Sequence, residues 1–176
     1  MMIRFVSNKF GFSLIELIVV LIISGFFLVV GSFGILKAVN AYLGQKTNSE
    51  TVYKGQLAMI RISKEFRNLT AVRYGQARST LIVYDIYRKG ILETHKLSWG
   101  GTAGDPLLYD DFSSNGNPLV DSVKNFQLEY YDTYNDPTPA LTWTGSTKMI
   151  GIKLELIGTD HISSVFTDKI APRNLP

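Results

Sequence analysis

The first residue that could do chemistry is a lone carboxylate in an apolar run. Glu16 is the only charged residue between Lys9 and Lys37, and the twenty residues from Leu17 to Leu36 carry no charge. An ionised carboxylate in the apolar part of a membrane-spanning helix costs about 2.5 to 3.5 kcal/mol even on insertion scales. Glu16 therefore needs a partner or a role that offsets this cost.

Two interpretations of Glu16 follow from the residues around it. Ser13 and Glu16 have the S-x-x-E spacing of a capping box, which satisfies N–H groups at a helix start, and the helix dipole favours a carboxylate there. The alternative is that the carboxylate pairs with a positive group in a setting of low dielectric constant. Both interpretations remain open at this level.

The other titratable residues do not form a catalytic pattern. The chain has no Cys, only two His, and no G-x-S-x-G, H-E-x-x-H or P-loop motif. We expect His95, in a strand beside Lys96, and His161, in a turn, to be surface histidines. Asp110 and Asp111 are adjacent strand residues, so their side chains point to opposite faces. The sequence predicts that the protein is not an enzyme.

A polar loop at residues 131–146 is the best candidate for a metal site. Asp132, Asn135 and Asp136 could supply oxygen ligands to calcium. The loop lacks the EF-hand spacing and a distant bidentate Glu, so ordinary turn chemistry is the preferred explanation. We expect no metal and no cofactor.

The apolar run that holds Glu16 is long enough to cross a bilayer. At 1.5 Å per residue, its twenty uncharged residues match a hydrocarbon core of about 30 Å. A cleaved secretory signal has a shorter apolar region, about 7 to 15 residues, and an A-x-A cleavage site. Arg4 and Lys9 precede the run, so residues 1–11 are expected on the cytoplasmic side and the carboxyl-terminal part across the membrane.

The helical pattern continues beyond the apolar run. Val52, Met59, Ile62, Phe66 and Leu69 recur at helical spacing, which predicts one helix, continuous or kinked near two glycines, that ends at about residue 72. Its second half is expected to pack on a domain through this stripe.

The opposite side of this helix is basic. Lys54, Arg61 and Lys64 lie there, and Glu50 and Lys54 form a favourable i,i+4 pair. Binding to nucleic acid is one interpretation of such a side. A solvated face, or one that meets acidic neighbours, is preferred because no aromatic residues interleave these charges.

From Ser79 onward the apolar residues alternate, which predicts β-strands. Lys89 and Gly90 separate two such runs and predict a hairpin, and a turn cluster at residues 113–117 follows a third run. An apolar helix stripe needs a partner, and the apolar faces of the strands supply it. The fold class is α+β, a long amino-terminal helix on an antiparallel sheet. The predicted strands are 80–88, 91–99, 106–112, 123–132, 149–157 and 164–170.

A short basic leader, then GFSLIE at residues 11–16, then a long apolar helix, resembles the prepilin signature of type IV pilins and type II secretion pseudopilins. The resemblance implies that a membrane-embedded prepilin peptidase cuts between Gly11 and Phe12 and methylates the amino group of Phe12. Glu16 is then the fifth residue of the mature chain, where the family has its glutamate. Its implied partner is the positive amine of its own chain or of a neighbouring subunit. Many major pilins have a helix-kinking Pro, whereas residues 31–34 of this chain read GSFG.

Weaker motifs in the rest of the chain point to particular subfamilies of pilin-like subunits. ISKEFRNLTAVR, PLVDSVKNFQLEYYD, IGIKLELI and FTDKIAPRNL are similar to J-type minor pseudopilins and W-type minor pilins. The resemblance implies a minor subunit, at or near the tip of a type II secretion pseudopilus or a type IV pilus, that helps to start assembly. A minor pilin of a DNA-uptake or adhesive pilus is the alternative, and a membrane-anchored enzyme or sensor is a weaker one.

The expected organisation follows from this resemblance. Residues 1–11 form the leader, residues 12–36 a transmembrane and filament-core helix, and residues 37–176 a periplasmic or extracellular domain. The protein is expected as a single-pass protein of the bacterial inner membrane, incorporated into a pilus or pseudopilus. Its expected partners are prepilin peptidase, other minor and major subunits, the inner-membrane assembly platform and membrane lipid, but not nucleic acid.

Overall fold

The fold was determined as a computed structural model that describes residue 11 and residues 13–111 and 116–174. The chain divides into two compact units, Met1–Leu43 and Gly44–Pro176. A single helix, α1 (Leu14–Arg67), contributes to both units. Each unit is described by itself.

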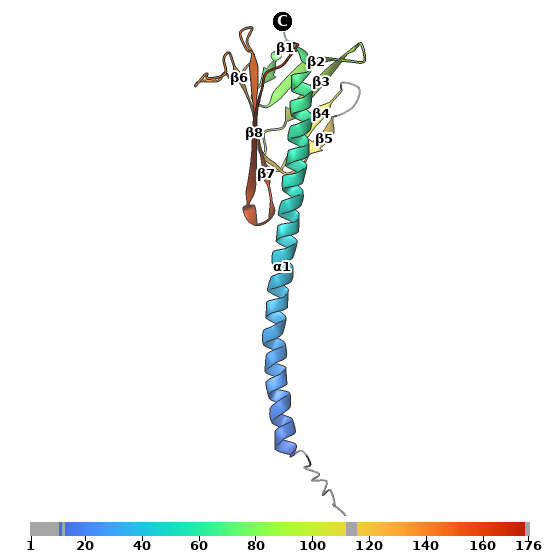
Figure 1. The fold of residues 1–176 in the computed structure, drawn as a ribbon, viewed down its shortest axis with the longest axis vertical. Helices are drawn as coiled ribbons and strands as arrows, with labels where there is room; N and C mark the ends of the chain where they lie inside the picture. The colour runs from blue at the N-terminus through green and yellow to red at the C-terminus, as the bar shows by residue number, and fades with distance from the viewer. Residues whose placement is uncertain (1–10, 12, 112–115, 175–176) are drawn as a thin grey trace, which may run out of the picture. The chain divides into compact units, whose positions relative to one another are not determined.

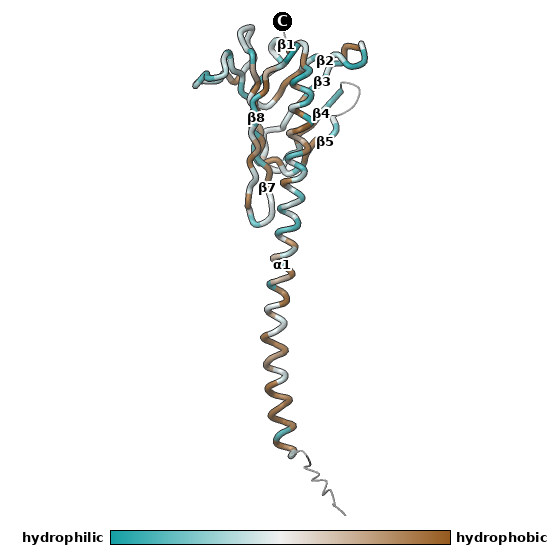
Figure 2. Tube along the Cα trace, viewed as in Figure 1, coloured by the Kyte–Doolittle hydropathy of each residue, from teal (hydrophilic) through white to brown (hydrophobic). Residues whose placement is uncertain are grey.

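In the first unit, α1 carries an exposed apolar surface. Its side chains from residue 14 to residue 43 are exposed, and Figure 2 colours most of this stretch as hydrophobic. The helix continues through Gly31 and Gly34, where the Ser32 hydroxyl donates a hydrogen bond of 2.7 Å to the carbonyl of Val29. This stretch of α1 is long and apolar enough to cross a membrane.

In the second unit, the end of α1 lies with two antiparallel sheets (Figure 1). The first sheet has five strands in the order β1-β2-β3-β4-β5, and the second has three in the order β6-β7-β8. The strands are β1 (Leu69–Arg78), β2 (Leu81–Arg88), β3 (Ile91–Trp99), β4 (Leu107–Asp110), β5 (Asn117–Val120), β6 (Val123–Tyr131), β7 (Met149–Ile157) and β8 (Ser163–Ile170), with a 3-10 turn at Thr159–His161. The α+β fold class is confirmed.

The apolar stripe of α1 forms the core of this unit with both sheets. Met59, Ile62 and Phe66 are buried on the helix, as their spacing predicts, whereas Val52 is half-buried. Phe66 meets Tyr84 of β2 edge to face at 5.4 Å between ring centroids. Each such side chain contributes about 1.5 to 3 kcal/mol when fully buried, so the stripe is a main source of stability. The inward faces of β6 and β7 are also as predicted: Phe126, Leu128, Tyr130, Ile150, Ile152, Leu154 and Leu156 are buried.

Gly55 sets how closely the second sheet approaches the helix. A Cβ at this position would overlap the ring of Phe166 in β8 and lie 3.0 Å from Cδ1 of Leu156 in β7. The absence of a side chain therefore leaves room for both strands. The helix passes through Gly44 and Gly55 as one element, so these glycines do not mark a break.

Two sequence expectations are wrong in detail. The helix ends at Arg67 rather than near residue 72, because the side-chain amide of Asn68 donates to the carbonyl of Lys64 (3.1 Å) and β1 starts at Leu69. Leu69 is buried as expected, but it is the first residue of β1 rather than part of the helix. Its spacing of three from Phe66 fits a helix, so the spacing could not show that the helix had already ended. β1 and the short β5 were not expected, and the strands form two sheets rather than one.

Contacts between α1 and the carboxyl-terminal segment complete the unit. The Ser63 hydroxyl donates to Oδ2 of Asp168 in β8 (2.6 Å), and the amide of Arg173 donates to the carbonyl of Arg67 (3.1 Å). Lys54 forms its ion pair with Asp121 (3.0 Å) rather than the expected pair within the helix. The segment that follows β8 is thus bonded to the end of the helix.

Candidate functional site

The amino-terminal motif begins just before α1. Gly11 is exposed, and a Cβ built on it would meet nothing within 4 Å, so packing within the described chain does not require glycine there. Phe12 lies outside the described residues, as do residues 1–10 of the expected leader. The carbonyl of Ser13 accepts the first helical hydrogen bonds, from the amides of Glu16 (3.0 Å) and Leu17 (3.2 Å).

Glu16 lies in the first turn of α1 and is exposed. Among the described residues, no side-chain hydrogen bond joins Ser13 and Glu16, so the capping at this end rests on the backbone. The helix dipole still favours a carboxylate in this turn. The carboxylate is thus accessible to a positive group from outside the described chain.

A polar network lies between α1 and the first sheet, and sequence reasoning missed it. Glu65 of α1 is buried, and its Oε1 accepts from Nη2 of Arg88 in β2 (2.9 Å). Oε2 of Glu65 lies 3.5 Å from the hydroxyl oxygen of Tyr109 in β4. The same guanidinium lies 3.7 Å from Oε2 of Glu93 in β3. These groups join the helix to three strands.

His95 belongs to this network and is not a surface histidine. Its side chain is buried on β3, stacked between Tyr84 and Tyr109 at centroid distances of 6.0 and 5.2 Å. Nε2 lies 3.2 Å from Oε2 of Glu93, and Nδ1 is hydrogen bonded to the hydroxyl of Tyr109. The prediction failed because alternation along β3 places His95 on the same inward face as Leu97.

When the imidazole of His95 is neutral, its two partners determine which ring nitrogen carries the hydrogen. A carboxylate only accepts hydrogen bonds, so the nitrogen that faces Glu93 carries the hydrogen. Nδ1 is then the acceptor, and the Tyr109 hydroxyl is the donor. Burial raises the pKa of Tyr109 to about 12, with a further contribution from the Glu65 charge, so this hydroxyl keeps its proton at neutral pH.

One sequence signal could have revealed this network. Glu65 follows Ile62 by three residues and precedes Leu69 by four, so it falls on the buried stripe of the helix. A charged residue is seldom buried unless it is paired, so its position predicts a cationic partner. The residue that supplies this partner, Arg88, could not be identified without the strand arrangement.

The loop at residues 131–146 uses its polar groups in turns. Oδ2 of Asp132 accepts from the Ser146 hydroxyl (2.8 Å), and Oδ1 of Asp136 accepts from the amide of Thr138 (2.9 Å). In the part of the chain that the structure describes, no group of three His, Cys, Asp or Glu side chains could hold a metal ion. Asn135 is exposed.

The remaining candidates are placed as follows. Asp110 is the last residue of β4, and the exposed Asp111 follows it. His161 ends the turn Thr159–His161, and its side chain lies outside the described part of the structure. These residues belong to separate loops and strand ends and are not gathered into one site.

Comparison with known families gave one match. The family described as the prokaryotic N-terminal methylation motif matches residues 6–32. Neither the search of curated proteins nor the search of solved structures found a match. The matched motif is the cleavage site of prepilin peptidase, and it implies processing and pilus assembly.

The matched region coincides with the start of the exposed apolar helix, which fits the single-pass membrane anchor of a pilin. The motif suggests a structural subunit rather than an enzyme. The fold, a long amino-terminal helix packed on antiparallel sheets, is consistent with a pilin-like fold. Motif and fold together support a type IV pilin-like protein.

Proposed function

We propose that the chain is a minor pilin or minor pseudopilin, a structural subunit at or near the tip of a type IV pilus or type II secretion pseudopilus that helps to initiate assembly. The observation that carries the proposal is the exposed apolar surface of α1 before Leu43, which holds the lone carboxylate Glu16 within the stretch that matches the methylation motif. Such a surface needs a cover. Lipid covers it before assembly, and neighbouring helices cover it afterwards.

Processing is assigned to the junction of Gly11 and Phe12. Prepilin peptidase cuts between these residues on the cytoplasmic side and methylates the new amino group of Phe12. The lack of any packing requirement at Gly11 supports a role toward an external enzyme, because glycine lets the backbone enter a peptidase site without a side chain.

Glu16 is assigned to charge pairing during assembly. Its exposed carboxylate pairs with the amine of Phe12, on its own chain or on a neighbour. This pairing offsets the cost of holding the carboxylate in an apolar environment. The pair forms where the helices of neighbouring subunits meet.

The proposed organisation has a leader at 1–11, a membrane and filament-core helix at 12–36, and a periplasmic or extracellular domain at 37–176. The proposed partners are prepilin peptidase, the inner-membrane assembly platform and other pilins or pseudopilins, and the weaker motifs of the chain resemble J-type pseudopilins and W-type minor pilins. A minor pilin of a DNA-uptake or adhesive pilus is the alternative. Two of the basic residues on the helix are used within the domain: Lys54 pairs with Asp121, and Arg61 lies over the Tyr109 ring at 4.4 Å. This use favours a role in protein assembly over one in DNA binding.

The first experiment tests processing. In a host with active prepilin peptidase, mass spectrometry of the membrane fraction should find a chain that begins with N-methylated Phe12. Gly11→Ala should keep the leader attached, because a side chain obstructs the cleavage site. A chain that still begins at Met1 in that host would refute the assignment.

The second experiment separates pairing from capping at Glu16. Glu16→Gln keeps a capping-box side chain and loses only a dipole contribution of about 0.3 to 1 kcal/mol, whereas breaking a buried charge pair costs about 3 to 5 kcal/mol. The variant should be cleaved normally but recovered poorly with sheared filaments or partner subunits at equal membrane abundance. Equal recovery would return Glu16 to the capping interpretation.

A further inference from the structure

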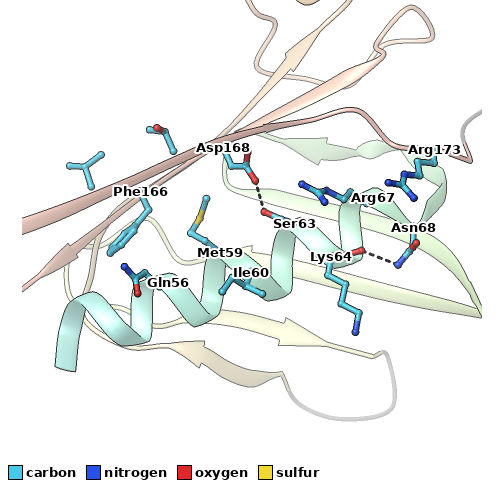
Figure 3. A pocket seen from close by; sticks show the side chains of 12 residues that line it. Gln56, Met59, Ile60, Ser63, Lys64, Arg67, Asn68, Phe166, Asp168 and Arg173 are labelled. Atoms are coloured by element: carbon cyan, nitrogen blue, oxygen red, sulfur yellow. Dashed lines mark hydrogen bonds between the residues drawn. The ribbon is translucent and has the colours of Figure 1, made fainter. Parts of the chain in front are cut away.

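A groove of about 870 Å³ lies between α1 and β8 in the second unit. Figure 3 shows its walls, with Gln56 to Arg67 of the helix and the following Asn68 on one side and Phe166 to Arg173 on the other. The processing motif is not part of this groove. A ligand of the groove would therefore be distinct from the contacts that the processing motif makes.

One wall of the groove is an unpaired strand edge. β8 is the outer strand of its sheet and pairs only with β7 in the described part of the chain. The amide of Lys169 donates to Oδ1 of Asp168 (2.8 Å), so it points away from β7. Hydrogen bonding alternates along an antiparallel strand, so Thr167 and Val165 also direct their N–H and C=O groups to the open edge. Both residues line the groove.

The floor of the groove is apolar and partly exposed. Ile60 of α1 is 65% exposed, beside the more buried Met59 of α1 and Phe166 of β8. An extended segment on the open edge would place alternate side chains against this floor. Apolar contacts and strand pairing are thus available along the same line.

One end of the groove is cationic. Lys64, Arg67 and Arg173 line it, and within the described residues none of them forms an ion pair. The acidic lining residue, Asp168, already accepts hydrogen bonds from the Ser63 hydroxyl and the Lys169 amide. The charge of the groove therefore complements an acidic group in the occupant.

We propose that this groove binds an extended, acidic segment of a partner protein, which adds to β8 as a further strand. The segment runs antiparallel to β8, because antiparallel pairing continues the pattern of the sheet and is slightly more stable. Arg173 follows the carboxyl end of β8, so the acidic side chains lie at the amino end of the segment, beside Arg67 and Arg173. Apolar side chains farther along the segment lie on Ile60 and Phe166.

The test uses the full chain in lipid nanodiscs and a short amidated peptide. The peptide starts with an acidic pair and continues with alternating Val and Thr, and its binding is followed by fluorescence anisotropy of a dye on the peptide. One control peptide carries lysines in place of the acidic pair. A second has the same side chains but is N-methylated at alternate backbone nitrogens, which removes the donors that would pair with β8.

Two matched variants of the protein complete the test. Thr167→Pro removes the outward N–H, and proline is tolerated on an edge strand where that group does not pair within the sheet. Thr167→Val keeps the N–H and removes the hydroxyl. The acidic peptide should bind wild type and Thr167→Val alike, and it should bind Thr167→Pro about five- to tenfold more weakly, the effect of one lost backbone hydrogen bond.

The outcomes are distinct. Weaker binding of both control peptides supports strand addition at an acidic-selective groove. Equal binding of the N-methylated peptide would overturn it and would indicate an apolar site that needs no strand edge, such as one for a lipid chain. No saturable binding of the acidic peptide in the millimolar range would also overturn it. If Thr167→Pro unfolds the domain, the N-methylated peptide makes the same comparison on the unaltered chain.

Discussion

Loss of the ion pair between Glu65 and Arg88 should destabilise the globular unit far more than loss of a similar pair at the surface. Replacing Arg88 with Met keeps much of the side-chain volume but leaves the carboxylate of Glu65 without its cation. The matched control is Lys54→Met, which breaks the pair with Asp121. The two pairs have nearly the same length, 2.9 and 3.0 Å, so they differ mainly in burial.

The magnitude follows from that burial. The Glu65 side chain is 9% exposed and that of Arg88 52%, whereas Lys54 and Asp121 are 54% and 61% exposed. Breaking a fully buried pair costs about 3 to 5 kcal/mol, and an exposed pair is worth about 0.2 to 1 kcal/mol. With one buried partner and one half-exposed partner, we expect Arg88→Met to cost about 2 kcal/mol and Lys54→Met at most about 0.5 kcal/mol.

Urea unfolding followed by tryptophan fluorescence measures both variants. Trp99 and Trp143 are the two tryptophans of the chain, and both lie in the second unit, so the signal reports on that unit. At an m-value of about 1 to 3 kcal/mol/M, the Arg88 variant should shift the midpoint by about 1 M, and the Lys54 variant should hardly shift it. Equal, small shifts would refute the reasoning, since the pair of Glu65 would then behave as a solvated surface pair.

Two further outcomes are expected from the same unit. Gly55→Leu should destabilise it by about 1 to 3 kcal/mol through overpacking against Phe166, whereas Gly44→Leu, where a Cβ meets nothing within 4 Å, should be neutral or slightly stabilising; thermal unfolding of both variants checks this, and equal melting temperatures would contradict it. The pKa of Tyr109 is raised from 10.0 to about 12 in the folded state, so its contribution to stability is complete below about pH 10 and is lost as the pH rises from 10 to 12. Between pH 10 and pH 12, the free energy of unfolding should fall less for Tyr109→Phe than for wild type. An equal fall in both proteins would argue against this contribution of Tyr109.

The parts of the fold that sequence patterns predicted are those with long, regular periodicity. The second-half stripe of α1 and the strands β2, β3, β4, β6, β7 and β8 follow from spacing, because each buries its apolar residues toward the core, and the first half of α1 follows from its long apolar run. β5 is only four residues long and contains Pro118, so it lacks the alternation that marks a strand. β1 includes Gly75 and has register shifts in its pairing with β2, and it followed a helical stripe without a turn signal.

The site shows the same division between local and long-range information. Gly11, Phe12 and Glu16 are neighbours in sequence, so their spacing pointed to them directly, and the family match covers them. The polar network joins Glu65, Arg88, Glu93, His95 and Tyr109 from four elements, and only strand register brings them together. A histidine beside a lysine gave no sign of burial, because the face of a strand residue depends on its register with its neighbours.

The hydrogen bond from Arg173 to Arg67 has a mechanical consequence. Tension along α1 would reach its last turn, where Arg67 is bonded to the segment after β8 and Ser63 is bonded to Asp168 within β8. β8 is held to β7 by a ladder of eight paired residues, from Ser163 to Ile170. Force that slides β8 along β7 loads these hydrogen bonds together, whereas force that peels it away breaks them one after another. The last strand therefore links the end of the helix to β7, and its ladder resists force along β8 as a unit.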